Sequence, residues 1–176
     1  MTIPAIPAGR IQLDQLAMKP LAALLRLEAA IGLDPAVRDL IKLRASQING
    51  CATCIDMHWK DARADGESEE RLYSLDAWRE SPLYSARERA ALALCEAITL
   101  IADDNVPDDV WEEVAEWFVP DAVWEAADDQ FGDEELAQLV FSITAINAWN
   151  RLMITARVEP GHCQPGMARE MAAAVR

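Results

Sequence analysis

The chain has 176 residues, of which 52% are hydrophobic and only seven are glycine, so its length and composition suit a helical domain with a substantial core. It contains no apolar run of 18 residues and no charged segment followed by an apolar core near its start. We therefore expect neither a membrane span nor a secretory signal, and a cytoplasmic location. The net charge of −14 disfavours binding to nucleic acid and to anionic membrane surfaces.

The negative charge is concentrated in residues 103–135, which hold fourteen Asp and Glu and no Lys or Arg. We interpret this window as a solvated surface, with attraction of a basic partner as the alternative. Within the window, VPDDVWEEV at 106–114 recurs as VPDAVWEAA at 119–127. The repeat predicts two short helices, each with a proline in its first turn.

Prolines and capping residues divide the chain into helical segments. Pro20 suits the first turn of one helix, and Asp34 with Pro35 caps the next. Ser85 and Glu88 form a capping box ahead of an apolar run. These signals and the apolar periodicity predict helices over about 21–31, 36–48, 50–65, 68–78, 86–102, 106–114, 119–127, 133–157 and 167–176.

No stretch alternates apolar and polar residues between hairpin turns, so we expect an all-α fold without a sheet. We predict one domain over residues 1–176. Its core covers about 20–161, between an irregular N-terminal arm and a C-terminal tail.

The segment Asp39–His58, DLIKLRASQINGCATCIDMH, carries the reactive side chains. Cys51, Cys54 and His58 fall at i, i+3 and i+7, so a helix from Gly50 onward places two sulfurs and one imidazole on a single face. A thiol in the first turn of a helix lies near unpaired N–H groups that favour the thiolate, and an adjacent imidazole can accept or supply a proton. The spacing indicates a redox dithiol with an acid/base group beside it.

Cys-x-x-Cys pairs also occur in zinc sites, haem attachment sites and inert cores. Structural zinc needs four ligands, and the only other His/Cys pair is His162 and Cys163, more than a hundred residues further on. Ile55 follows Cys54 where a c-type haem site needs histidine, and a thioredoxin fold needs strands that are not predicted. A zinc site and an inert buried pair remain as alternatives.

The segment LIKLRASQINGCATCIDMHWKDAR resembles the core motif of the AhpD-like alkylhydroperoxidases in the carboxymuconolactone decarboxylase superfamily. ARERAALALCEAITL, VPDDVWEEV and FGDEELAQLVFSITAINAWNRL, with Arg157–Gly161, extend the resemblance over most of residues 20–161. The resemblance implies an all-helical fold, homo-oligomers such as trimers or hexamers, and peroxide reduction that needs no metal, haem or flavin cofactor.

The resemblance also implies a role for each residue of the motif. By position, Cys54 is the peroxidatic thiolate, Cys51 is the resolving thiol, and His58 is the histidine that relays protons. The family glutamate that lies twelve residues before the first cysteine is Asp39 in this chain. Asp39 keeps the carboxylate on a shorter side chain, which leaves the efficiency of the proton relay open.

We therefore predict a thiol peroxidase that reduces hydroperoxides and is re-reduced by a dithiol or thioredoxin-like donor. Two alternatives remain. One is a lactone decarboxylase of the same superfamily, although members of that branch generally lack the Cys-x-x-Cys pair. The other is a non-enzymatic redox-responsive adaptor, in which the disulfide changes an interaction surface.

The remaining candidates are interpreted as structural. Cys95 lies in an apolar helix and is predicted in the core, whereas Cys163 lies in a Pro- and Gly-rich loop and is predicted to be a surface thiol, with His162 exposed beside it. The helical phase of Asp56 points it to solvent. Trp59 adjoins the motif histidine and is a candidate roof for the site.

Overall fold

The computed structural model describes residues 9–104, 106–118 and 131–174, and all regular structure in these ranges is helical. The predicted all-α fold is confirmed for this part of the chain. None of these helices has both the length and the apolar character that crossing a membrane requires. The elements are α1 (Leu13–Leu16), α2 (Met18–Ala30), α3 (Pro35–Asn49), α4 (Ala52–Ala64), α5 (Glu69–Tyr73), η1 (Leu75–Ala77), α6 (Ala86–Thr99), α7 (Ile101–Asp104), α8 (Asp108–Phe118), α9 (Phe131–Ala156) and α10 (Met167–Ala173).

Two helix starts follow directly from the capping residues. Asp34 accepts hydrogen bonds from the backbone N–H groups of Ala36 and Val37, at 3.1 and 3.2 Å, and so caps α3. Ser85 and Glu88 form the predicted capping box of α6. Both starts were predictable because the partners lie within three residues of each other.

Two predicted helices are interrupted. The segment predicted as one helix over 68–78 divides into α5 and η1 at Ser74, whose hydroxyl donates to the carbonyl oxygen of Glu70 (2.8 Å). The run predicted to reach residue 102 breaks after α6, and a short α7 follows. Leu100 and Ile101, which suggested a continuing buried stripe, are exposed.

Most of the described acidic side chains of the window are solvated, whereas Glu135 is partly exposed and pairs with Arg87. Asp103, Asp108, Asp109, Glu112 and Glu113 are all exposed, which agrees with the predicted surface. α8 covers most of the first copy of the duplicated segment. The second copy, at 119–127, lies outside the described residues.

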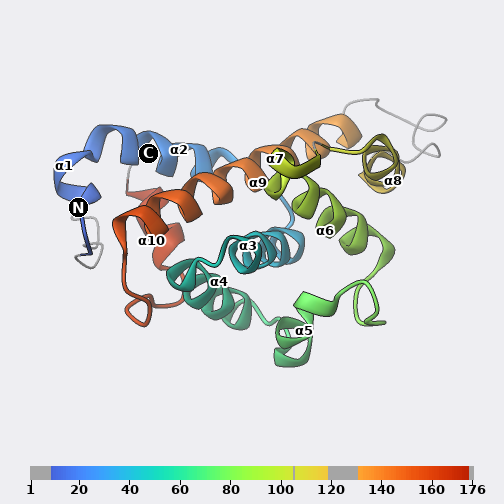
Figure 1. The fold of residues 1–176 in the computed structure, drawn as a ribbon, viewed down its shortest axis with the longest axis horizontal. Helices are drawn as coiled ribbons and strands as arrows, with labels where there is room; N and C mark the ends of the chain where they lie inside the picture. The colour runs from blue at the N-terminus through green and yellow to red at the C-terminus, as the bar shows by residue number, and fades with distance from the viewer. Residues whose placement is uncertain (1–8, 105, 119–130, 175–176) are drawn as a thin grey trace.

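Helix α3 lies near the centre of the fold and packs against α4, α6 and α9 (Figure 1). Its buried residues Ile41 and Ala45 belong to one apolar cluster with Leu94 of α6 and with Ile143 of α9. α3 leads through a single turn into α4, so the packing that holds α3 also positions the start of the cysteine helix.

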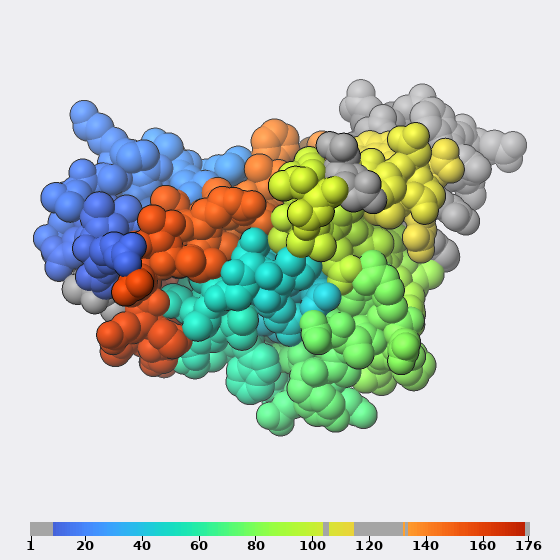
Figure 2. Space-filling model, viewed as in Figure 1, coloured from blue at the N-terminus to red at the C-terminus, as the bar shows by residue number. Residues whose placement is uncertain are grey.

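The C-terminal segment returns along α4 after α9 ends. Four hydrogen bonds join it to α4. Thr53 Oγ1 donates to the Val158 carbonyl and Lys60 Nζ donates to the Cys163 carbonyl (3.0 Å), while the N–H groups of Gly161 and Gly166 donate to Asp56 (3.0 Å) and Asp61 (2.6 Å). α10 then packs against α2. As a result, the N-terminal helices and the C-terminal part of the chain lie at the same end of the molecule (Figure 2).

Candidate active site

The turn between α3 and α4 positions both motif cysteines. Gly50 has a φ of 68°, a left-handed conformation that favours glycine, and its N–H donates to the carbonyl of Gln47 (3.1 Å). The N–H of Cys51 donates to the carbonyl of Ser46 (3.0 Å). Cys51 then occupies the N-cap of α4, and Cys54 lies in its first turn.

Cys51 and Cys54 form a disulfide, with their Cα atoms 5.3 Å apart. Both residues are buried, with exposed fractions of 1% and 0%. They pack in an apolar cluster with Met153, Ala156 and Val158. The structure thus brings the two predicted cysteines together in a site that is shielded from solvent.

An asparagine cluster holds this turn against α9. The side-chain amide of Asn49 donates to the side-chain oxygens of Asn147 and Asn150, each at 2.9 Å. Asn150 in turn donates to the hydroxyl of Ser46 (3.1 Å), which is fully buried. Because buried amides are costly to leave unpaired, this cluster fixes how α9 docks on the cysteine turn. The sequence offered no signal for it, since the partners lie about a hundred residues apart.

His58 lies one helical turn after Cys54, on the same face of α4, and is 5% exposed. Burial lowers its pKa well below 6.5, and the positive charges of Lys42 and Arg38 lower it further. Its Nε2 atom is buried and has no hydrogen-bond partner among the described residues. At neutral pH the imidazole is therefore uncharged.

Asp39 lies on α3, is 6% exposed, and lines the same cavity as His58. Its Oδ1 accepts a hydrogen bond from Arg38 Nε (2.8 Å), and no hydrogen bond within the described residues joins it to His58. Burial raises the pKa of Asp39, against the opposing effect of Arg38. The structure thus brings the predicted carboxylate to the site and pairs it with the neighbouring arginine.

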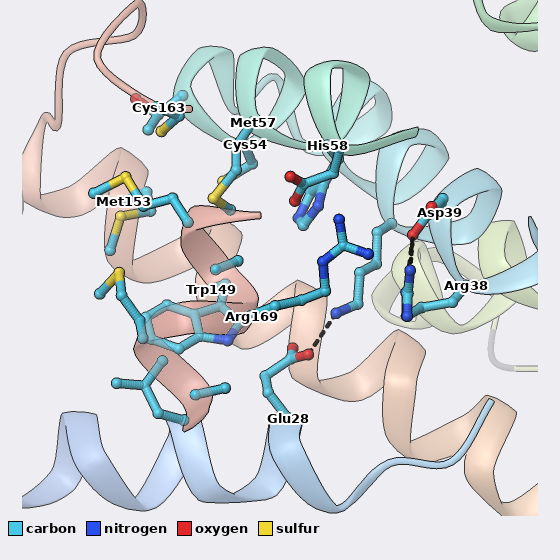
Figure 3. A pocket seen from close by; sticks show the side chains of 18 of the residues that line it. Glu28, Arg38, Asp39, Cys54, Met57, His58, Trp149, Met153, Cys163 and Arg169 are labelled. Carbon is cyan, nitrogen blue, oxygen red and sulfur yellow. Dashed lines mark hydrogen bonds and ion pairs between the residues drawn. The ribbon is translucent and has the colours of Figure 1, made fainter. Parts of the chain in front are cut away.

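A cavity of about 340 Å³ adjoins Cys54 and His58 (Figure 3). Figure 3 shows Cys54, Met57 and His58 on one side, Trp149 and Met153 on another, and Glu28 of α2 opposite His58, with Arg169 extending between them. Lys42 forms an ion pair with Glu28 inside this lining. Sequence reasoning missed most of this lining; the one available signal was Lys42, a lysine flanked by Ile and Leu in an otherwise apolar stretch of α3.

The prediction that Cys163 is a surface thiol is wrong. The residue is buried, with 7% exposed, and it lines the cavity near Cys54. Burial raises the pKa of its thiol, so the thiol form dominates at neutral pH. The error arose because the C-terminal segment folds back on α4, whereas its Pro- and Gly-rich sequence suggested an open loop. The neighbouring His162 is exposed and Cys95 is buried, as predicted.

The interpretations of Asp56 and Trp59 also need correction. Asp56 does not line the cavity, but it is only partly exposed, because it pairs with Lys60 and accepts the N–H of Gly161. Trp59 does not roof the site; it packs against the apolar cluster that contains Leu72. The helical phase of α4 turns Trp59 away from the cysteine face.

No group of three His, Cys, Asp or Glu residues in the described ranges is arranged to hold a metal ion. The two motif sulfurs are bonded to each other, and His162 and Cys163 do not join them as a ligand set. The arrangement instead provides a dithiol/disulfide pair, a neutral imidazole, and an adjoining cavity.

Comparisons with known proteins identify the family of the chain. The sequence profile of the carboxymuconolactone decarboxylase family matches residues 16–97. The uncharacterized protein YdfG of Bacillus subtilis is 47% identical over 117 residues, which cover 66% of this chain and 71% of YdfG. The uncharacterized protein YnjA of Escherichia coli is 42% identical over 69 residues, covering 39% of this chain and 37% of YnjA.

Solved structures share the fold. ATU0492, a protein of unknown function from Agrobacterium tumefaciens that is assigned provisionally to AhpD antioxidant defence, is 38% identical, with a TM-score of 0.77 over 87% of this chain and 98% of its own. A peroxidase-related protein from Silicibacter is 18% identical, with a TM-score of 0.63 over 85% and 72% of the two chains. The debrominase Bmp8 is 15% identical, with a TM-score of 0.60 over 85% and 71%. The last two matches concern the fold alone.

Proposed function

The chain belongs to the carboxymuconolactone decarboxylase family, and from that premise we propose that it is a thiol-dependent hydroperoxide reductase that cycles Cys51 and Cys54 between dithiol and disulfide. One observation carries the proposal: a buried Cys51–Cys54 disulfide lies beside the neutral imidazole of His58, at a cavity large enough for a small organic molecule. Disulfides in cytoplasmic proteins are more often catalytic than structural. The provisional AhpD assignment of ATU0492 points to the same class of reaction.

The first step is attack of the Cys54 thiolate on the terminal oxygen of the hydroperoxide. His58 takes the proton from the Cys54 thiol as the attack begins. Its lowered pKa keeps the resting imidazole uncharged and makes the imidazolium a stronger acid, which favours return of the proton to the departing oxygen. The sulfur–oxygen bond forms as the O–O bond breaks, and the departing alkoxide takes the proton back from His58. The products are an alcohol and a Cys54 sulfenic acid.

The second step closes the disulfide. The Cys51 sulfur attacks the sulfenic sulfur of Cys54, and the hydroxyl leaves as water with the proton of the Cys51 thiol. Both cysteines lie at the start of α4, where the helix dipole favours thiolate. A dithiol or thioredoxin-like donor then transfers two electrons and two protons and restores the dithiol. Asp39 lies in the cavity wall and influences proton transfer by His58. Its hydrogen bond with Arg38 sets the orientation of its carboxylate.

The proposal includes a cytoplasmic location and assembly into a homo-oligomer, a trimer or a hexamer. It assigns the substrate to hydroperoxides and includes no metal, haem or flavin. Size-exclusion chromatography with light scattering measures the oligomer directly.

The deciding experiment measures peroxide consumption by the purified protein with excess dithiol, for wild type and Cys54→Ala. We expect catalytic consumption in wild type, a loss of about a thousandfold in the variant, and a Cys51–Cys54 linkage in the oxidised protein by mass spectrometry. Cys95→Ala is the matched control. Its thiol is fully buried in the core, where burial raises the pKa to about 12, so turnover should persist.

The same variants separate the alternatives. Decarboxylation of a lactone that survives Cys54→Ala would favour the decarboxylase. A disulfide that forms and never turns over would favour a redox-responsive adaptor. Absence of the disulfide in the oxidised protein would eliminate both the peroxidase and the redox-responsive adaptor.

A further inference from the structure

The cavity beside Cys54 is larger than hydrogen peroxide needs. Its volume is about 340 Å³, whereas a water molecule occupies about 30 Å³ in the liquid. Pockets for small organic ligands begin at about 300 Å³. The cavity therefore has the dimensions of a site for an organic molecule.

Most of the cavity wall is apolar and adaptable. Met57, Trp149, Met153 and Met171 line it together with Leu25. Methionine side chains adjust to irregular hydrocarbon shapes, and tryptophan offers a rigid face. The body of a fitting ligand is therefore hydrocarbon.

The charged side chains of the lining all have partners. Lys42 pairs with Glu28 and Arg38 pairs with Asp39 within the lining, while Arg169 pairs with Asp65 outside it and Asp61 accepts the N–H of Gly166. A cationic group on a ligand would meet Lys42 beside Glu28, and an anionic group would meet Glu28 and Asp39. The pairing therefore favours a neutral polar group.

One carboxylate oxygen in this lining lacks a partner. Lys42 engages Glu28 Oε2, while Oε1 is buried and has no hydrogen-bond partner within the described ranges. The Glu28 side chain is 14% exposed, so it is largely shielded from bulk solvent. An ionised carboxylate oxygen can only accept a hydrogen bond, so the group that fits it is a donor.

The second unpartnered atom is Nε2 of His58, on the opposite side of the cavity. His58 is 5% exposed and extends from α4, whereas Glu28 extends from α2 (Figure 3). A ligand that spans the cavity can thus satisfy one polar atom at each side while its hydrocarbon body contacts the methionines and Trp149.

We propose that the cavity binds a neutral, largely hydrocarbon hydroperoxide that carries a second hydroxyl group, with the peroxide at Cys54 and His58 and the hydroxyl donating to Glu28 Oε1. This inference rests on the proposed function and specifies its substrate class. Glu28 is then the residue that distinguishes a hydroxylated substrate from a plain alkyl one.

The test measures binding to the oxidised protein, which needs no turnover. Straight-chain alcohols and α,ω-diols of four to ten carbons serve as analogues of the alcohol product, with affinities from calorimetric titration. At one chain length the diol should bind about tenfold more tightly than the mono-alcohol, the effect of one well-placed hydrogen bond to a charged acceptor. The optimal length reports the span between the two polar ends.

Variants of Glu28 and Lys42 show whether the preference for the diol comes from the Glu28 carboxylate. Glu28→Leu combined with Lys42→Met removes both charges together, so no unpaired ion is left behind, and the diol and mono-alcohol should then bind equally. Glu28→Gln keeps the shape and should retain only part of the preference. Glu135→Gln, which removes an ion-paired carboxylate away from the cavity, is the control and should keep the tenfold ratio.

Four results would overturn the inference. The first is equal binding of diol and mono-alcohol to wild type, which means that only water meets Glu28, and the second is a diol preference that survives in the double variant. The third is tighter binding of an ω-amino alcohol than of the diol, and the fourth is no binding of either alcohol. Failure of the proposed function is seen separately, as peroxide consumption that does not depend on Cys54.

Discussion

The two sides of the cavity differ in how the chain builds them. On the reactive side, Cys51, Cys54 and His58 come from one helix and its cap, within eight consecutive residues. On the opposite side, Glu28 comes from α2 and Trp149 from α9, far apart in the sequence. The comparison teaches that local spacing supplies the reactive groups, whereas long-range packing sets their pKa values and the space for a ligand.

The largest expected effect is on the reactive side. His58→Gln keeps a polar side chain and removes the proton relay, so kcat/KM for hydroperoxide should fall by about 10²- to 10⁴-fold. Stopped-flow peroxide consumption measures the loss. The control is His162→Gln, which removes an exposed imidazole outside the site and should retain activity. Equal losses in both variants would remove His58 from the mechanism.

The next effect is on the opposite side. Lys42→Met leaves the carboxylate of Glu28 buried without its partner and should lower the free energy of unfolding by about 3–5 kcal/mol. The double variant Glu28→Leu, Lys42→Met should lie within about 1 kcal/mol of wild type. Urea denaturation measures both. A double variant as unstable as the single one would show that the ion pair itself stabilises the fold.

The asparagine cluster that holds α9 against the cysteine turn gives a smaller effect. Asn150→Ala leaves the hydroxyl of Ser46 and the amide of Asn49 with one partner fewer in a buried site. We expect a loss of about 1–3 kcal/mol of unfolding free energy. Thermal unfolding measures it, and Asn150→Asp serves as the variant that keeps the acceptor and loses the donor. A change below about 0.5 kcal/mol would mean that the cluster does not hold α9 to the turn.

The smallest effect is the pH dependence of stability. The pKa of His58 lies well below 6.5 in the folded protein, so on acidification the unfolded chain binds a proton there before the folded chain does. Stability should therefore fall as pH drops below 6.5, by about 1 kcal/mol between pH 6.5 and 5.5. The comparison of wild type with His58→Gln isolates the contribution of His58 to the pH dependence of stability. An identical pH dependence in the two proteins would contradict the lowered pKa.

The errors about the site arose from contacts between distant segments and, for Trp59, from helical phase. The Pro- and Gly-rich surroundings of Cys163 suggested exposure, yet the return of the chain along α4 buries the residue at the cavity. Trp59 was predicted near the site because it adjoins His58, but consecutive residues of a helix point in different directions. Trp149, which does line the cavity, gave no such hint because α9 reaches the site only through tertiary packing.

The sequence by itself determined the helical class, the caps of α3 and α6, and the spacing that joins Cys51 to Cys54 with His58 one turn further on. These depend on interactions within a few residues, which local patterns encode directly. Only the tertiary structure decided that Asp39 pairs with Arg38, that His58 is held uncharged, and that Glu28 faces it across a cavity. Those features depend on burial and on charges brought together from separate helices, and neither is specified by spacing along the chain.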